Sequence, residues 1–537
     1  MTLTYSKNGI EIKTKESNDD VTVTEVVEGP LHTVTVTAKK DITLISYKQS
    51  SHWAMNANDT KFWNGYQSWT DTREAKGNFV ERDVRNIFGP ALKFWKFDRY
   101  GDSHIYDYSK SKLHGYDFFY AFGNDCRISY SLNAENAFLI YSYNKEKNSL
   151  ILYSDVEGKS LKKGESFQVL KYKTFTTIYE AKKAFEEDFP KKDLAKIFGY
   201  TSWYNYYQNI SEDIILRDLE GLDERFNLFQ IDDGYETFVG DWLEVDGKKF
   251  PNGLEPILEA IKKKGYRAGI WLAPLVAERK SRLFIEHPEY FKKDEDGSYC
   301  SCGSNWSGFY ALDLENEEVW KYIEKCLTYY KDMGFSFFKL DFLYAASRAE
   351  YKGKTRAEMA SYAYKRLRNI LGDSIILGCG ATIGQAANVF DYLRIGPDIS
   401  LSFDDVWYMR KMHRERISTK VTLQNTIFRH FMNKRLFGND PDVFLLRDDN
   451  IKLSKAQKEA IIIIDAIYGQ LLMNSDNLSE YDEEKKELLN RALDIFYHAQ
   501  DRSHKVDGDI IEITYKLNGR AEKFLYSTSK GVFVNGR

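Results

Sequence analysis

The feature that most constrains the fold is an alternation of short apolar runs and amphipathic stretches that begins near residue 196. The apolar runs read as buried strands, and stretches with helical spacing separate them. The eight strand candidates are 198–204, 228–233, 267–273, 335–343, 374–380, 392–396, 435–439 and 470–475. Helical patterns fall at 211–225, 254–264, 318–333, 356–371, 405–417 and 455–468. This alternation predicts a (β/α)8 barrel rather than an open doubly wound sheet, because no glycine-rich phosphate loop follows the first strand.

The regions on either side of this alternation read as β-rich. Residues 1–188 contain period-two runs such as VTVTEVV at 21–27, which predict an N-terminal β-sandwich domain. Residues 189–500 form the predicted (β/α)8 barrel. Residues 501–537 form a small C-terminal antiparallel β domain, too short to be stable alone. The predicted fold class is therefore a multidomain α/β chain.

Composition argues against several classes of function. The 76 basic and 80 acidic residues nearly balance, which argues against a nucleic-acid-binding protein. We see no apolar run long enough to span a bilayer and no apolar signal-peptide core, so no membrane partner is expected. Five cysteines without zinc-site spacing favour free thiols in a reducing cytoplasm, and they predict no metal site.

Two charged side chains interrupt the apolar strand FSFFKLDFL at 335–343. Lys339 and Asp341 are two residues apart, so they point to the same side of a strand. Because burying unpaired charge is costly, the pair is either a structural salt bridge or part of a site. A second carboxylate, Asp398 in RIGPD, follows the sixth strand, where it is a site residue or a turn aspartate. Glycoside hydrolysis needs two carboxyl groups, one to attack or activate water and one to protonate the leaving oxygen.

Other strand ends also carry polar or aromatic side chains. Asp232 and Asp233, in FQIDDGYE, would hold sugar hydroxyls, ligate a metal or cap the next helix. Trp271 and Trp203 end the third and first strands, where a ring stacks on a sugar or packs in the core. Two candidates remain. Cys379, in LGCGA, leaves room for a ligand to approach closely, and Arg394 is either a core ion-pair residue or a ligand for a sugar hydroxyl.

Taken together and in order, these motifs resemble glycoside hydrolase family 36, the α-galactosidases. The matching segments, from about residue 60 to residue 480, are WNGYQSWT, TSWYNY, QIDDGYE, GDW, FPNGL, GIWLAP, FFKLDFL, LGCGA, LRIGPD, NDPD and NSD. The resemblance implies a sandwich, a (β/α)8 barrel and a C-terminal β domain, with Asp341 as nucleophile and Asp398 as acid/base. It places substrate-binding groups at Asp232, Asp233, Trp271, Lys339, Arg394, Trp203, Cys379 and, from the N-terminal motif, Trp69.

The resemblance also sets expectations for assembly and activity. The C-terminal domain is short for the family, and the surroundings of Asp398 are similar to the compact, monomer-type branch, so a monomer or small homo-oligomer is expected. The expected activity is retaining hydrolysis of terminal non-reducing α-D-galactosyl residues from galactose-containing oligosaccharides, without a cofactor. The alternatives are an α-N-acetylgalactosaminidase, another α-glycosidase, a transglycosylase, or a non-catalytic carbohydrate-binding relative.

Overall fold

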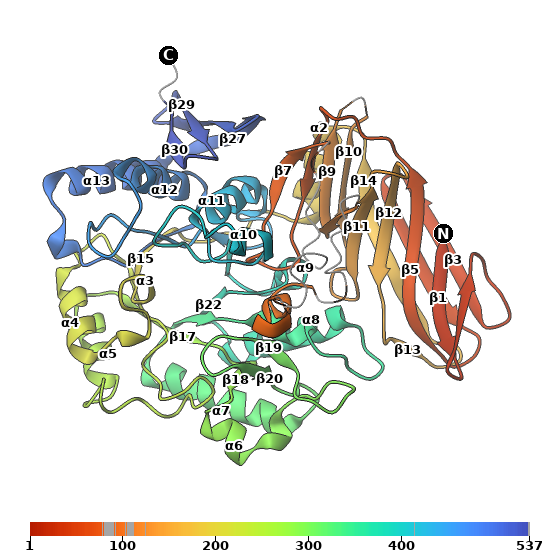
Figure 1. Cartoon of the computed structure of the whole chain (residues 1–537), viewed down its shortest axis with the longest axis horizontal. Coiled ribbons are helices and arrows are strands. Elements are labelled where there is room, and N and C mark those ends of the chain that lie inside the picture. Colours follow the sequence, from red (N-terminus) through yellow and green to blue (C-terminus); the bar gives the residue numbers. More distant parts are fainter. Residues whose placement is uncertain are drawn as a thin grey trace.

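The computed structural model describes residues 1–77, 79, 91, 93–102, 104, 112–123, 125–412 and 414–534. A β-sandwich lies beside a larger barrel with surrounding helices, and a small sheet lies against the last helices of the barrel (Figure 1). These three parts confirm the predicted fold class. The domain bounds at residues 188 and 500 stay predictions, and the last predicted domain includes residues 535–537, which lie outside the described residues.

The N-terminal sandwich consists of two antiparallel sheets that enclose their own hydrophobic core. Its strands are β1 (Thr2–Lys7), β2 (Ile10–Thr14), β3 (Val21–Glu28), β4 (Leu31–Ala38), β5 (Ile42–His52), β6 (Thr60–Trp63), β7 (Arg73–Lys76), β8 (Lys112–Tyr116), β9 (Phe118–Phe122), β10 (Arg127–Ser131), β11 (Phe138–Asn144), β12 (Ser149–Asp155), β13 (Ser160–Leu161) and β14 (Ser166–Phe175). One sheet has the order β2-β1-β5-β12-β11-β8, with β13 paired to β5, and the other has the order β3-β4-β14-β10-β9-β6-β7. In β4, Val34, Val36 and Ala38 face the core, as the period-two pattern predicts.

The barrel sheet is parallel and closes on itself. Its segments are β15 (Ile197–Thr201), β16 (Leu228–Ile231), β17 (Arg267–Leu272), β21 (Phe337–Leu340), β22 (Ile375–Gly378), β23 (Tyr392–Arg394), β24 (Gly438–Asp440), β25 (Val443–Phe444) and β26 (Leu471–Asn474). They pair in the order β24-β23-β22-β21-β17-β16-β15-β26-β25. Pro441 and Asp442 separate β24 from β25, so the two ends of this order are pieces of one strand and the sheet forms an eight-stranded barrel. This seventh strand begins later than the predicted 435–439 because the short helix η5 (His430–Met432) and its turn occupy the preceding residues.

The helices around the barrel begin and end where local chemistry allows. They include α4 (Glu212–Gly221), α5 (Glu255–Lys263), α7 (Glu317–Met333), α8 (Arg356–Leu371), α11 (Thr419–Phe428), α12 (Lys455–Tyr468) and α13 (Glu483–His498). Thr355 and Glu358 form a capping box at the start of α8, and Gly334, with φ of 119°, ends α7. Among the described residues, no helix is both long and apolar enough to cross a membrane.

One predicted helix differs from the structure. The pattern at 405–417 yields only α10 (Met409–Met412), and the longer helix α11 begins after Ser418. The Ser418 hydroxyl accepts a hydrogen bond from the Val421 amide, and this cap fixes the start of α11. The segment between β23 and α11 is therefore mostly an extended loop at the mouth of the barrel.

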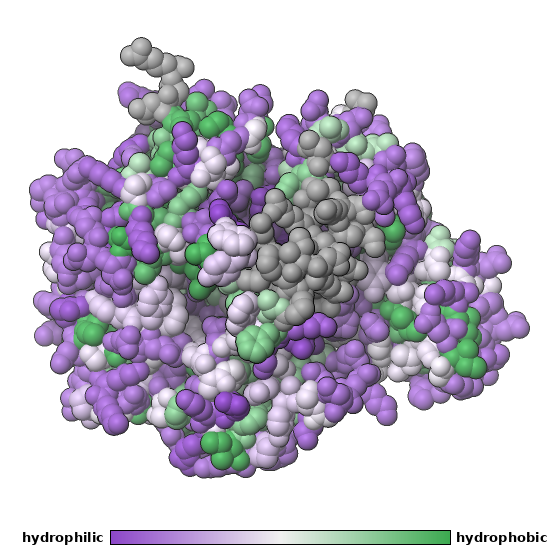
Figure 2. Space-filling view, viewed as in Figure 1, coloured by the Kyte–Doolittle hydropathy of each residue, from purple (hydrophilic) through white to green (hydrophobic). Residues whose placement is uncertain are grey.

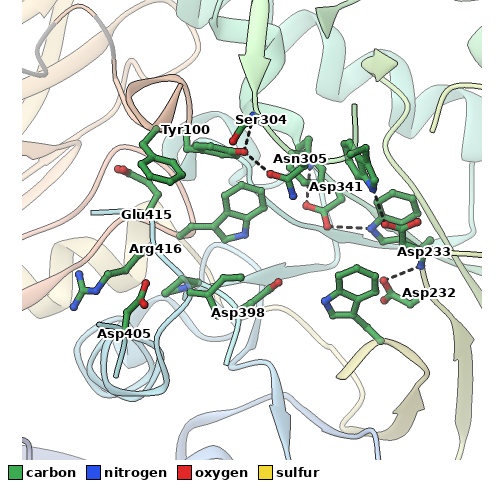
Figure 3. Close-up of a pocket in the computed structure, with 18 of the residues that line it drawn as sticks. Tyr100, Asp232, Asp233, Ser304, Asn305, Asp341, Asp398, Asp405, Glu415 and Arg416 are labelled. Atoms are coloured by element: carbon green, nitrogen blue, oxygen red, sulfur yellow. Dashed lines mark hydrogen bonds between the residues drawn. The ribbon is translucent and has the colours of Figure 1, made fainter. Parts of the chain in front are cut away.

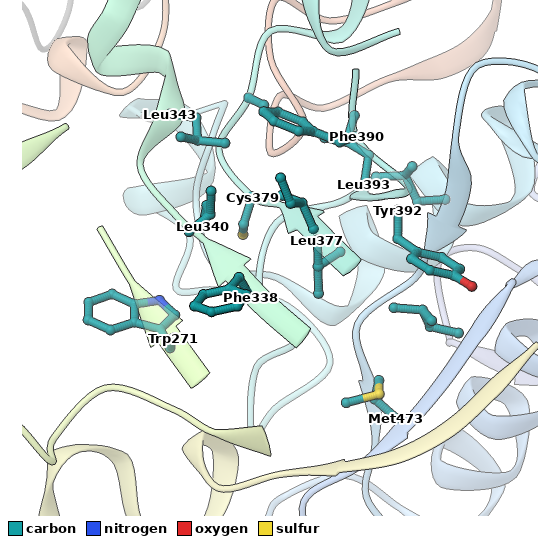
Figure 4. Close-up of a cluster of buried hydrophobic side chains, with 14 of the residues drawn as sticks. Trp271, Phe338, Leu340, Leu343, Leu377, Cys379, Phe390, Tyr392, Leu393 and Met473 are labelled. Carbon is teal, nitrogen blue, oxygen red and sulfur yellow. The ribbon is translucent and has the colours of Figure 1, made fainter. Parts of the chain in front are cut away.

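The barrel wall is built from apolar side chains of neighbouring strands. Figure 4 shows Phe338 and Leu340 of β21 near Leu377 of β22 and Leu393 of β23. All of these side chains are buried. Lys339 lies between Phe338 and Leu340, in a four-residue strand whose residues are all buried, so its charge requires a partner within the protein.

The C-terminal β domain is a single sheet that packs on the barrel. Its strands are β27 (Gln500–Asp507), β28 (Ile510–Leu517), β29 (Arg520–Ser527) and β30 (Val532–Phe533), in this order. Ile511 and Ile513 of β28 join the same hydrophobic cluster as the barrel residues. The Tyr468 hydroxyl of α12 donates to the Ser503 carbonyl at 3.1 Å. The sheet thus buries its apolar face against α12, as expected for a unit too small to fold alone.

Two buried arginines join the sandwich to the barrel. Arg356 in α8 lies between Asp102 and Asp155, with its Nη1 3.0 Å from Asp102 Oδ1 and its Nε 3.1 Å from Asp155 Oδ2. Arg429, after α11, donates to Asn64 Oδ1 at 3.0 Å and to the Ser68 carbonyl at 2.6 Å. Separating the two parts would remove both carboxylate partners of Arg356 and the sandwich acceptors of Arg429, which is costly in a buried setting.

Removing the Arg356 charge should destabilise the chain far more than removing an exposed charge of the same helix. Arg356→Leu leaves Asp102 and Asp155 buried without their cation and should cost about 3–5 kcal/mol of unfolding free energy. The matched control is Lys365→Ala, because Lys365 pairs with Glu135 across the same interface while both side chains are more than half exposed. This control should cost less than about 1 kcal/mol. Urea unfolding measures both losses, and equal losses would contradict the role of Arg356 as a buried link between the sandwich and the barrel.

Candidate active site

A cavity of about 240 Å³ lies at the carboxyl ends of the barrel strands, where strand-end loops meet a loop of the sandwich (Figure 3). The sequence-predicted residues that line it are Trp69, Trp203, Asp232, Asp233, Trp271, Lys339, Asp341 and Asp398. The two remaining candidates, Cys379 and Arg394, are buried behind this lining. Strand-end position thus brings together residues that are hundreds of positions apart in the sequence.

Asp341 directly follows β21, and two donors fix its carboxylate. Trp271 Nε1 donates to Oδ2 at 3.0 Å, and the Phe342 amide donates to Oδ1 at 2.8 Å. Burial raises the pKa of Asp341, the Lys339 ammonium and the Trp271 hydrogen bond lower it, and the nearby Asp398 charge raises it. Burial therefore disfavours the ionised form of Asp341, whereas the Lys339 ammonium and the two N–H donors favour it.

Lys339 forms its direct ion pair with Asp232 rather than with Asp341. The Lys339 Nζ lies 2.8 Å from Asp232 Oδ2, and the two side chains are 5% and 2% exposed. Thr201 and Gln230 donate to the same carboxylate oxygen at 3.0 and 2.6 Å. Burial lowers the pKa of Lys339, but the attraction of Asp232 outweighs it, so the net direction is upward. The ammonium thus stays charged at the floor of the cavity.

Asp233 is held by a tryptophan that sequence reasoning did not single out. Trp306 Nε1 donates to Asp233 Oδ2 at 3.0 Å, and Gln208 Nε2 donates to Oδ1 at 3.1 Å. Burial raises the pKa of Glu236, and the neighbouring Asp233 charge raises it further. Burial also raises the pKa of Asp233, although its hydrogen bonds with neighbouring side chains, including Gln208 and Trp306, lower it. The turn requires Gly234, whose φ is 118°, because a Cβ there would lie 2.8 Å from Gln208.

Arg394 meets three carboxylates and fixes Asp398 from behind. Its Nη1 lies 3.0 Å from Asp398 Oδ1, its Nε 2.7 Å from Asp440 Oδ2 and its Nη2 2.9 Å from Asp442 Oδ1. The Asp398 side chain is 29% exposed and lines the cavity, whereas the Arg394 side chain is only 3% exposed. Burial raises the pKa of Asp442 to about 7, although the Arg394 charge opposes this shift. Of the two readings left open for Arg394, its contacts in the structure favour the core ion pair.

Trp69 reaches the barrel from the sandwich and covers Cys379. Trp69 Nε1 donates to Cys379 Sγ at 3.4 Å, and burial holds the pKa of this thiol well above its ordinary value. Gly380 allows the close approach, because a Cβ at this residue would lie 2.9 Å from the Trp69 ring. Trp203 starts the short helix α3 (Trp203–Tyr206), is half-buried and lines the cavity. The sandwich and the barrel therefore each contribute one wall of the cavity.

Sequence reasoning missed part of the lining. Ser304, Asn305 and Trp306 come from the loop after β19 (Ser301–Gly303), and Tyr100 comes from the sandwich. The Tyr100 hydroxyl accepts the Ser304 amide at 3.0 Å and donates to Asn305. A tryptophan within a short polar run between two strands was the available signal for Trp306. Tyr100 carries no local signal, because these partners lie more than 200 residues away in the sequence.

Parts of the chain are similar in sequence to known proteins. Residues 200–371 match the family model Melibiase. An α-galactosidase of Escherichia coli is 28% identical over 196 residues, which are 34% of this chain and 26% of that protein. An A type blood α-D-galactosamine galactosaminidase of Flavonifractor plautii is 33% identical over 124 residues, which are 21% of this chain and 11% of that protein. The chain thus matches about a quarter or less of the length of these relatives.

A solved structure shares the fold over nearly the whole chain. TtGalA, an α-galactosidase from Thermus thermophilus in complex with p-nitrophenyl α-D-galactopyranoside, superposes with a TM-score of 0.72 at 22% identity. The match covers 97% of this chain and 98% of that one. At this identity the likeness establishes the common arrangement of sandwich, barrel and C-terminal sheet.

The buried Asp442 predicts that stability falls as the pH rises. Its folded pKa of about 7 lies above the ordinary value of 3.8, so its contribution to stability is complete below the ordinary value and is lost as the pH rises through about 7. Between pH 5 and pH 7, this single group should remove about 1.4 kcal/mol of unfolding free energy per pH unit.

Urea unfolding at pH 5, 6 and 7 measures this slope. Asp442→Asn cannot ionise and should show a slope that is shallower by the contribution of one proton. Asp41→Asn serves as the control, because Asp41 is exposed and its pKa is already lowered by Lys162, so the slope in this window should stay the same. A slope equal to that of the parent chain in Asp442→Asn would show that Asp442 is ionised throughout.

Proposed function

We propose that this chain, a member of the melibiase and α-galactosidase group of glycoside hydrolase family 36, is a retaining α-galactosidase. It would release terminal non-reducing α-D-galactosyl residues from galactose-containing oligosaccharides. The observation that carries the proposal is one cavity lined by both Asp341 and Asp398, which follow different barrel strands. Two carboxyl groups at the carboxyl-terminal face of a barrel are the arrangement that glycoside hydrolysis uses.

The reaction proceeds in two displacements. The Asp341 carboxylate attacks the anomeric carbon while protonated Asp398 donates its proton to the glycosidic oxygen, so the leaving sugar departs as an alcohol and a galactosyl ester forms. Deprotonated Asp398 then takes a proton from water, and the water oxygen attacks the same carbon. Asp341 leaves as a carboxylate, Asp398 regains its proton, and galactose is released with its configuration retained. In retaining enzymes the two carboxyl groups lie about 5–5.5 Å apart.

The remaining lining residues suit a hexose ring. The Trp271 N–H group orients one oxygen of the nucleophile. The Asp232–Lys339 pair and Asp233 present charged acceptors and one donor, which bind sugar hydroxyls by charge-assisted hydrogen bonds. Trp306 adds an apolar ring that fits the C–H face of a sugar. The donor and acceptor groups are paired within the protein, so they are already oriented before a sugar enters.

The similar proteins support α-galactosides as the substrate class. TtGalA has been solved in complex with stachyose as well as with an aryl α-galactoside. The relative from Flavonifractor plautii supports a second candidate, an α-galactosaminidase on the same site. Rates on p-nitrophenyl α-galactoside and on its galactosamine, N-acetylgalactosamine and glucose analogues distinguish the two. We expect the galactoside to be cleaved fastest, and a faster galactosamine analogue would favour the second candidate.

Two further sequence-based predictions belong to this proposal. A cytoplasmic location is supported by five cysteines that form no disulfide in the structure. A monomer or small homo-oligomer is supported by a cavity that this one chain lines from several elements of its own.

Replacing the two carboxyl groups should affect substrates differently. Asp341→Ala should lower kcat by a factor of 10³ or more, roughly, on every α-galactoside, because no covalent intermediate can form. Asp398→Ala should slow the hydrolysis of raffinose by a factor of roughly 10²–10⁴. It should slow the first step on 2,4-dinitrophenyl α-galactoside much less, because that leaving group departs without a proton. Full activity of Asp341→Ala, or the same substrate pattern in both variants, would refute the assignment.

The acid limb of the pH profile should follow the ionisation of Asp341. Trp271→Phe keeps a ring but removes the N–H group whose hydrogen bond lowers the Asp341 pKa, so the acid limb of kcat/KM should move to higher pH. A hydrogen bond to a charged group contributes about 1.5 kcal/mol, which corresponds to a shift of about one pH unit. Trp320→Phe is the control, because Trp320 is buried in α7 and donates to the Leu314 carbonyl. An acid limb that stays in place in Trp271→Phe would contradict this role.

A further inference from the structure

The sandwich contains a second cavity, which the proposed reaction does not use. Its volume is about 370 Å³, against about 240 Å³ for the cavity at the barrel mouth, and the two cavities share no lining residue. Most of its lining comes from β3, β4, β9, β10 and β14 of one sheet and from β5, β11 and β12 of the other. The cavity therefore lies between the two sheets of the sandwich, which Figure 1 shows beside the barrel.

One sheet of the sandwich separates this cavity from the barrel. Phe118 of β9 contacts Phe431, which follows α11, with ring centroids 6.0 Å apart, and it belongs to the hydrophobic cluster of the barrel. The next residue, Phe119, lines the cavity and belongs to the cluster of the sandwich. Because successive side chains of a strand point to opposite faces, the cavity and the barrel lie on opposite faces of this sheet.

The floor of this cavity is mostly apolar, but it includes one buried hydroxyl without a partner. Phe119, Tyr141 and Leu150 are buried, and the Tyr141 hydroxyl lies 2.7 Å from Ser129 Oγ. Tyr172 also lines the cavity and is 8% exposed, yet its hydroxyl forms no hydrogen bond with the residues that the structure describes. Because a buried polar group without a partner costs free energy, this hydroxyl favours a polar occupant.

Two charges of opposite sign line the same cavity without an ion pair. The Arg127 guanidinium is 5.3 Å from the centroid of the Trp53 ring, and its Nη1 lies 3.5 Å from Ser51 Oγ. Glu25, at the exposed rim, accepts a hydrogen bond from Gln49 Nε2 at 3.1 Å. Neither charge lies within ion-pair distance of an opposite charge in the described part of the chain. Figure 2 shows hydrophilic residues over much of the outer surface of the sandwich, so solubility does not require charges between its sheets.

These groups define the chemistry of the ligand. Burial raises the pKa of Tyr172 to about 12, the Glu25 charge adds to this rise and the Arg127 charge opposes it, so the three groups lie in one region. A donor, an acceptor and a hydroxyl with no net charge suit a neutral polyol, whose hydroxyl groups both donate and accept. The apolar floor suits the C–H face of a pyranose ring. An alkyl ligand would satisfy only the floor.

We propose that the cavity between the sheets is a separate sugar-binding site, which holds a neutral mono- or disaccharide through Arg127, Glu25 and Tyr172. Its volume exceeds that of the cavity in which the proposed reaction takes place, so it has room for one or two sugar units. Glu25 is the only carboxylate in its described lining, whereas glycoside hydrolysis uses two carboxyl groups. The site therefore binds a sugar without cleaving it, and its existence does not depend on the proposed function.

Fluorotryptophan labelling of the whole chain gives each cavity its own reporter. Trp53 lies against Arg127 beside the sandwich cavity. The tryptophans that line the barrel cavity are Trp69, Trp203, Trp271 and Trp306. In fluorine NMR, the Trp53→Phe spectrum assigns the Trp53 signal. Titration with galactose, or with lactose, whose β linkage the proposed reaction does not cleave, should shift this signal.

Two variants test the contacts with the sugar. Tyr172→Phe keeps the ring and removes only the unpartnered hydroxyl, so it should raise the Kd read at Trp53 by about fivefold. Arg127→Ala removes a charged donor and should raise it by about tenfold or more. Both should leave kcat/KM on p-nitrophenyl α-galactoside unchanged. Tyr179→Phe is the matched control, because Tyr179 of α2 (Ile178–Asp188) is 79% exposed and lies outside the cavity.

Thermal unfolding identifies a variant that fails to fold, and Tyr172→Phe decides the question if Arg127→Ala unfolds. A Trp53 signal that neither sugar moves, or one that moves with leucine alone, would overturn the sugar site and leave the α-galactosidase proposal standing. An equal Kd in the parent chain and in both variants would overturn it as well. A chain whose Trp53 signal responds to the sugars, but which cleaves no α-galactoside, would support the sugar site and overturn only the proposed function.

Discussion

The geometry of the barrel mouth depends on one buried guanidinium. Arg394 compensates three carboxylates at once, and a single positive charge cannot neutralise three ionised groups in a buried setting. Hydrogen bonds stabilise the remaining negative charge, and burial favours the protonated form of Asp442. Asp442 accepts from the Tyr204 hydroxyl at 2.6 Å and from the Ile399 amide at 2.7 Å, and its pKa is raised to about 7 by burial. Because Ile399 follows Asp398, the same contacts fix the loop that carries the proposed acid/base.

The break in the seventh strand belongs to this arrangement. Pro441 has no N–H group to donate to the sheet, and Asp442 has a φ of 94°, a conformation that non-glycine residues rarely adopt. The chain therefore leaves the sheet after β24, turns the Asp442 carboxylate toward Arg394, and rejoins the sheet as β25. Asp440, the last residue of β24, contacts the same guanidinium through its Oδ2.

Much of the fold and part of the site could be predicted from the sequence, for physical reasons. Lys339 and Asp341 stood out because charge in an apolar strand needs a partner, and strand periodicity placed both on one side. The true partner of Lys339, Asp232, was identified as a site residue but not as its ion pair, since register between strands is a tertiary property. The prediction of a helix at 405–417 was wrong. The spacing of apolar residues indicated a helix there, but the Ser418 cap makes the helix α11 begin only after Ser418. Trp306 and Tyr100 were missed because loop conformation has no period to read.

The cavity is a property of the assembled chain and not of the barrel. Trp69 and Tyr100 belong to the sandwich side, yet they form one wall of the space that Asp341 and Asp398 line from the other. Arg429 ties this wall to the barrel by binding the Ser68 carbonyl next to Trp69 and the Ile395 carbonyl near Asp398. Under the proposed function, turnover therefore requires the sandwich to be docked on the barrel. A chain whose sandwich has separated keeps Asp341, Asp398 and its parallel sheet, but it exposes the two proposed catalytic carboxylates on an open face that lacks the wall formed by Trp69 and Tyr100.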